Sequence, residues 1–112
     1  MFNQGRFSEA ISQFQEAIRL RPGDADAHYN CGVALGRQGR LDDAIMQLQE
    51  ALRLQPEHAE AHFNLGVALR GKGRLAEAIS QFEEAVRLRP GYVEARTNLS
   101  FELGKKGASG NK

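Results

Sequence analysis

Apolar residues recur at intervals of three and four along most of the chain, the spacing of one face of an α-helix. In residues 25–38 this spacing is carried by Ala27, His28, Cys31, Ala34 and Leu35. A second face follows before Pro56, made by Leu41, Ala44, Ile45, Leu48, Ala51 and Leu52. Because no segment keeps a period of two, the pattern predicts amphipathic helices and no sheet.

Glycine and proline mark where these helices end. Gly39 follows the first of them, where a helix C-terminus favours a residue that tolerates positive φ. Pro56 follows the second and cannot continue a helix. The connections are short, so neighbouring helices must run antiparallel.

The whole pattern repeats with a period of 34 residues. Equivalent positions hold Pro22, Pro56 and Pro90, then Ala10, Ala44 and Ala78, then Asn30, Asn64 and Asn98. Residues 25–58 and 59–92 align without a gap as two full repeats. Residues 6–22 match the second helix of a repeat only, and residues 93–107 match the first helix only. We therefore expect one domain over residues 1–107, with six helices, and a flexible tail at 108–112.

This repeat resembles the tetratricopeptide repeat. The resemblance is carried by small residues and a proline at fixed places: Gly32, Ala44, Ala51 and Pro56 in one repeat, and Gly66, Ala78, Ala85 and Pro90 in the next. The glycines would let the two helices of a repeat approach closely. The resemblance implies an all-α solenoid of antiparallel helix pairs that binds a protein or an extended peptide in a concave groove.

In the family, the first helix of each repeat lines that groove. Carried onto this sequence, the resemblance implies these peptide-binding residues: Asp26, Tyr29, Asn30, Val33, Arg37, Glu60, Phe63, Asn64, Val67, Arg70, Glu94, Asn98 and Phe101. Several of them are aromatic or aliphatic, which is unusual for a face that only meets water. The acidic residues among them favour basic side chains or hydrogen-bond donors in the ligand.

Asparagine occupies one groove position in all three first helices. An amide offers both a donor and an acceptor, so Asn30, Asn64 and Asn98 could pair with the backbone of an extended peptide. This is similar to the asparagine ladder of the O-linked N-acetylglucosamine transferase family. The alternative is that asparagine serves packing within each repeat. The lysine and arginine residues of the family's carboxylate clamp are absent from the matching positions.

Composition excludes several other classes of function. The 112 residues include 15 basic and 14 acidic residues, a net charge of +1, which gives no reason to expect nucleic acid or an anionic membrane as a partner. No apolar stretch is long enough to span a membrane. With one cysteine, the chain has no internal disulfide, and a cytoplasmic location is the default expectation.

We find no set of residues typical of catalysis, so we expect no enzyme activity and no cofactor. His58 and His62 are four residues apart, but no cysteine or third histidine accompanies them as a zinc ligand. His28 and His62 share one repeat position and are interpreted as packed side chains. Cys31 stands where the next repeat has Leu65, so we expect a buried apolar residue.

Two alternatives concern the chain as part of an assembly. The incomplete repeats could stack end to end between chains, through Phe7, Ile11, Phe14 and Ile18 at one end and Ala95, Leu99 and Leu103 at the other. Arg96 and Glu102 replace a histidine and an alanine of the other repeats, as if the second end were adapted to water. The chain could also be a fragment of a larger superhelix.

Overall fold

The computed structural model describes residues 4–110, and within them the side chains of Arg6 and of residues 8–105. The described residues form six α-helices and no strand, which confirms the predicted all-α class. The helices are α1 (Gln4–Leu20), α2 (Ala25–Arg37), α3 (Leu41–Leu54), α4 (Ala59–Gly71), α5 (Leu75–Leu88) and α6 (Val93–Gly110). Helix α6 continues to Gly110, beyond the predicted end at residue 107 and into the predicted flexible tail.

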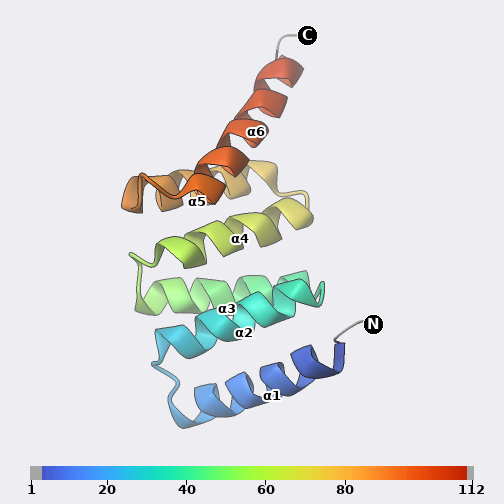
Figure 1. The fold of residues 1–112 in the computed structure, drawn as a ribbon, viewed down its shortest axis with the longest axis vertical. Coiled ribbons are helices and arrows are strands. Elements are labelled where there is room, and N and C mark those ends of the chain that lie inside the picture. Colours follow the sequence, from blue (N-terminus) through green and yellow to red (C-terminus); the bar gives the residue numbers. More distant parts are fainter. Residues whose placement is uncertain (1–3, 111–112) are drawn as a thin grey trace. The chain divides into compact units, whose positions relative to one another are not determined.

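The helices group into two compact units, one up to Glu57 and one from His58 onward. In the first unit α2 packs against both α1 and α3. In the second unit α5 packs against both α4 and α6 (Figure 1). Each unit is therefore a set of three helices with one central helix.

Local sequence explains where the helices start and stop. The Asp24 side chain accepts hydrogen bonds from the backbone N–H groups of Asp26 and Ala27, at 3.0 and 3.3 Å, and so caps α2. His58 Nδ1 accepts from the N–H of Ala61 at 3.2 Å and caps α4 in the same way. The turns after α2 and α4 contain Gly39 and Gly73, whose φ angles are +80° and +78°. These two glycines confirm the predicted helix ends.

The core of the first unit lies between α1, α2 and α3. It is formed by Ile11, Cys31, Ala34, Leu35 and Ala44, with Phe14 and Ile18 partly buried against it. Cys31 is completely buried, as the sequence predicts. Burial also raises the pKa of its thiol above the ordinary value of 9.0.

A glycine in each unit allows close contact between a pair of helices. A Cβ atom added to Gly32 would lie 2.8 Å from Cγ of Leu48, on α3. A Cβ added to Gly66 would lie 2.7 Å from Cε1 of Phe82, on α5. Both positions therefore require glycine for this packing, which confirms the predicted close approach within each repeat.

Candidate functional site

The predicted peptide-binding residues form an accessible stripe on each of α2, α4 and α6. On α2 the stripe consists of Asp26, Tyr29, Asn30, Val33 and Arg37, all exposed or half-buried. On α4 it consists of Glu60, Phe63, Asn64, Val67 and Arg70, all half-buried, and on α6 of Glu94, Asn98 and Phe101. None of the thirteen side chains is buried, whereas the core-facing residues of the same helices are. These side chains are therefore within reach of a partner.

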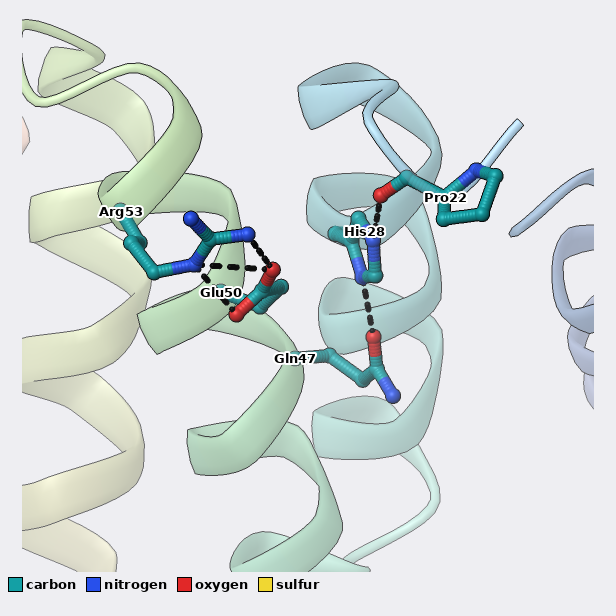
Figure 2. Close-up of polar contacts among 5 residues, drawn as sticks. All are labelled: Pro22, His28, Gln47, Glu50 and Arg53. Atoms are coloured by element: carbon teal, nitrogen blue, oxygen red, sulfur yellow. Dashed lines mark hydrogen bonds and ion pairs between the residues drawn. The ribbon is translucent and has the colours of Figure 1, made fainter. Parts of the chain in front are cut away.

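The His28 side chain links α2 to the turn before it and to α3. Its Nε2 atom donates a hydrogen bond to the Pro22 carbonyl at 2.9 Å, and its Nδ1 atom lies 2.7 Å from the side-chain oxygen of Gln47, on α3 (Figure 2). His28 is only 6% exposed. The interpretation of this histidine as a packed repeat residue is confirmed.

Phe63, the aromatic residue of the α4 stripe, packs against neighbouring rings. The Phe63 ring lies 5.7 Å from the ring of Phe82 and 5.2 Å from that of Tyr92, measured between centroids. The Arg89 guanidinium lies over Tyr92, 4.2 Å from the ring centroid, and pairs with Glu60 at 2.9 Å. The half-buried Phe63 ring therefore packs against two other rings.

Glu60 keeps its negative charge in this setting. Burial raises the pKa of its carboxyl. Hydrogen bonds from its own backbone N–H and from Arg89, together with the positive charge of Arg89, lower the pKa by more than burial raises it. The net pKa is below the ordinary value of 4.5. Arg89 and Tyr92 precede α6 in the chain and are absent from the predicted site, because they lie between helices and their relation to Phe63 depends on the folded structure.

Two of the three asparagine side chains are bonded to their own helices. Nδ2 of Asn64 donates to the Glu60 carbonyl at 2.9 Å, and Nδ2 of Asn98 donates to the Glu94 carbonyl at 2.7 Å. The Asn98 side-chain oxygen also accepts a hydrogen bond from Arg70. Asn30 is exposed, and within the described part of the chain its side chain has no hydrogen-bond partner. Asn64 and Asn98 thus each bond to a carbonyl of their own helix, and these bonds fix the orientation of the two amide groups.

Glu102 is buried, contrary to the expectation that this end of the chain is adapted to water at that position. It is 2% exposed, and neither carboxylate oxygen accepts a hydrogen bond. Its nearest charges are Lys105 Nζ at 3.3 Å and Arg70 Nη1 at 3.7 Å. These two cations therefore lie near a buried carboxyl group at the position that Ala34 and Ala68 occupy in the other repeats. Arg96, in contrast, is exposed and donates to the Pro90 carbonyl at 3.1 Å.

The structure corrects two of the predicted self-association residues. Ile11 is 4% exposed because α2 covers it, and Ala95 is completely buried, so neither is available to another chain. Phe14, Ile18 and Leu99 are half-buried, and Leu103 is 43% exposed. The side chain of Phe7 lies outside the described residues.

Among the residues with described side chains, no group of three or more metal-binding side chains comes together. In residues 4–110, no helix is both long enough and apolar enough to cross a membrane. The spacing of His58 and His62 suits a pair of metal ligands, but the His58 side chain caps α4.

Several solved structures are similar to this chain. MamA is 27% identical with a TM-score of 0.86, over 90% of this chain and 59% of MamA. The first TPR of Spaghetti (RPAP3), bound to an HSP90 peptide, is 24% identical with a TM-score of 0.89, over 95% of this chain and 84% of the other. YrrB, a TPR protein with an unusual peptide-binding site, is 26% identical with a TM-score of 0.79, over 84% of this chain and 48% of YrrB. This chain thus spans less than two thirds of MamA and of YrrB.

No curated protein sequence matches the chain. Sequence models of a repeat family do match it. A model described as TPR repeat covers residues 1–39, and a model described as tetratricopeptide repeat covers residues 32–93, which is more than half of the sequence. Together with the helix pairs and the glycine contacts, these matches show that the chain belongs to the tetratricopeptide repeat (TPR) family.

Proposed function

We propose that this chain is a protein-interaction module that binds an extended peptide or a partner protein through its accessible stripes, which lie on α2 in the first unit and on α4 and α6 in the second. The observation that carries the proposal is the accessibility of all thirteen predicted residues on helices whose other faces form the core. Accessible aromatic side chains are unfavourable in water and provide large contact areas for a partner.

Phe101 is the most exposed aromatic residue of the stripes. It is 60% exposed, and Lys105 lies over its ring, 5.1 Å from Nζ to the centroid. An aromatic ring beside a cation suits a ligand in which an apolar side chain lies next to a carboxylate or a carbonyl group. Burying such a ring contributes about 1.5–3 kcal/mol to binding.

The similar structures support the same class of function. One of them holds a peptide, and another is described as having a peptide-binding site. Neither statement identifies the ligand of this chain. The class of ligand that we propose, an extended peptide, follows from the stripes and from the polar amides along them.

Two matched variants test the proposal. Peptides of twelve random residues displayed on phage are selected against the full chain, and the affinity of the enriched peptides is measured for wild type, Phe101→Ser and Met46→Ser. Met46 is a suitable control because it is 63% exposed but lies on α3, a helix that carries none of the stripes. We expect Phe101→Ser to weaken binding about tenfold or more and Met46→Ser to have no effect. Equal binding by all three proteins, or no enrichment, contradicts the proposal.

A further inference from the structure

A cluster of charged side chains joins α4 to α6 in the second unit. Arg70, near the end of α4, donates a hydrogen bond to the side-chain oxygen of Asn98, on α6. Its Nη1 atom lies 3.7 Å from the buried carboxyl group of Glu102, and Lys105 Nζ lies 3.3 Å from the same group. Two cations from different helices therefore converge on one buried acid.

The repeat fold does not require this cluster. One repeat earlier, the positions of the two cations and the acid hold Gly36, Gly71 and Ala68, so the same kind of helix pair packs without these charges. A buried acid that accepts no hydrogen bond is also unfavourable for stability. Because neither the repeat nor stability explains Glu102, the cluster points to a function.

The two cations have hydrogen-bond donors that can serve another molecule. Neither oxygen of Glu102 accepts a hydrogen bond, so neither cation donates to it. Within the described residues, the Lys105 ammonium donates to no acceptor, and the Arg70 side chain donates only through Nη1. The Arg70 and Lys105 side chains are 32% and 49% exposed. An acceptor from solvent can therefore reach the ammonium and the rest of the guanidinium.

The charge of the cluster favours an anionic acceptor. Two cations outnumber the one acid, so the cluster is net positive in either protonation state of Glu102. The acids of the stripes, Glu60 and Glu94, lie near the opposite ends of α4 and α6. A separation of ten or eleven helical residues is about 15 Å along the axis, which exceeds the screening length of about 8 Å at physiological salt. These distant acids therefore oppose an anion at the cluster only weakly.

Apolar side chains adjoin the cations on both helices. Phe101 precedes Lys105 by one turn, is 60% exposed, and has its ring centroid 5.1 Å from Nζ. Val67 precedes Arg70 by three residues on α4 and is half-buried. The contact with the Phe101 ring also holds the ammonium beside an apolar surface. The cluster thus offers cations and apolar contacts next to each other.

We propose that Arg70 and Lys105 bind an acidic side chain of the peptide, and that Phe101 and Val67 contact an apolar side chain within two residues of it. This inference rests on the proposed peptide-binding function and names the chemistry of the ligand. The carboxylate of the aspartate or glutamate accepts charge-assisted hydrogen bonds from both cations. Neither cation occupies a position of the family's carboxylate clamp, whose lysine and arginine residues are absent from the matching positions of this chain.

The test uses the full chain and the peptides selected against it by phage display. Each enriched peptide is synthesised with an acetylated N-terminus and an amidated C-terminus, so its only carboxylates belong to side chains. Further versions replace one acidic residue at a time by its amide, aspartate by asparagine or glutamate by glutamine. Calorimetry measures their affinities for wild type, Lys105→Met and Arg96→Met. Arg96 is the matched control because it is an exposed cation of the same helix that lies outside the stripes.

We expect the enriched peptides to contain an acidic residue within two positions of an apolar one. The amide version should bind wild type at least tenfold more weakly. Lys105→Met should weaken the acidic peptide about tenfold and change the affinity of the amide version less than twofold, whereas Arg96→Met should change neither. Enriched peptides without an acidic residue, or equal binding of the acidic and amide versions, overturn the inference and leave the proposed function intact. Failure to enrich any peptide overturns both.

A second background separates binding from stability, because Lys105→Met also removes a cation from the neighbourhood of the buried acid. Glu102→Met removes that acid and keeps both cations. In this background the preference for the acidic over the amide peptide should persist, and adding Lys105→Met should reduce it about tenfold. Circular dichroism confirms that each variant is folded. Loss of the preference in Glu102→Met alone assigns it to the buried acid and overturns the inference.

Discussion

Gly66 lies so close to Phe82 that a Cβ atom on the glycine would be 2.7 Å from Cε1 of the ring. Gly32 has the same relationship to Leu48, one repeat earlier in the chain. These two contacts set the distance between the helices of each complete repeat. They also set the orientation of α2 and α4, and through it the position of the accessible stripes on both helices.

Gly66→Ala should destabilise the protein although alanine is the better helix former. The added methyl group displaces the Phe82 ring, which costs about 1–3 kcal/mol, and the gain in helix propensity of up to about 1 kcal/mol only partly offsets this cost. Gly104→Ala, on α6, is the control, because a Cβ there meets nothing within 4 Å. It should leave stability unchanged or raise it. Urea denaturation of the two variants measures the difference, and equal stabilities would argue against the close contact.

Replacing Glu102 by methionine should stabilise the protein. The carboxylate is buried without a hydrogen bond, and its cations Arg70 and Lys105 have side chains that are 32% and 49% exposed, so they remain solvated when the acid is removed. We expect Glu102→Met to raise the free energy of unfolding by about 1 kcal/mol or more. Arg70→Met should have the opposite sign, because it leaves the buried acid with one cation fewer. Destabilisation by both variants in urea would show that the ion pair is a net stabilising contact.

Asn64→Ala tests which of its two interpretations is correct. The amide donates to the Glu60 carbonyl, but alanine is the better helix former, so the stability of the protein should change little. If the amide also pairs with a bound peptide, the affinity for the selected peptides should fall about fivefold, corresponding to about 1 kcal/mol. A variant that unfolds more easily while keeping its affinity supports a packing role alone.

Cys31 should react slowly with thiol reagents in the folded protein and quickly in denaturant. Burial raises the pKa of the thiol, so the reactive thiolate is scarce as well as inaccessible. The folded-state pKa is above the unfolded value, so the folded state loses relative stability as pH rises from the unfolded pKa toward the folded pKa. The stability of wild type relative to Cys31→Ala should therefore decrease as the pH rises above the ordinary thiol pKa of 9.0. Fast labelling of the native protein contradicts the placement of Cys31 in the core.

The 34-residue period predicts the helices because each turn has its own chemical signal, such as Gly39 with its positive φ and the proline that follows α3. The same period predicts which residues are accessible on α2 and α4, since equivalent residues occupy equivalent environments. Where the chain departs from the period, the sequence is less informative. Glu102 replaces alanine and is interpreted as a surface residue, but Arg70, 32 residues earlier, and Lys105 allow it to be buried. Ile11 is interpreted as uncovered because its repeat is incomplete, yet the α2 side of α1 is buried as in a complete repeat.

The most direct test of the peptide-binding proposal is an NMR titration of the isotopically labelled full chain with a peptide selected against it. The proposal predicts that the largest changes in amide signals occur along the stripes, around Tyr29 and Val33 on α2, Phe63 and Val67 on α4, and Phe101 on α6. The amides of α3 and α5 should change little. Changes concentrated on α3 and α5, with the stripes unaffected, would contradict the proposed site.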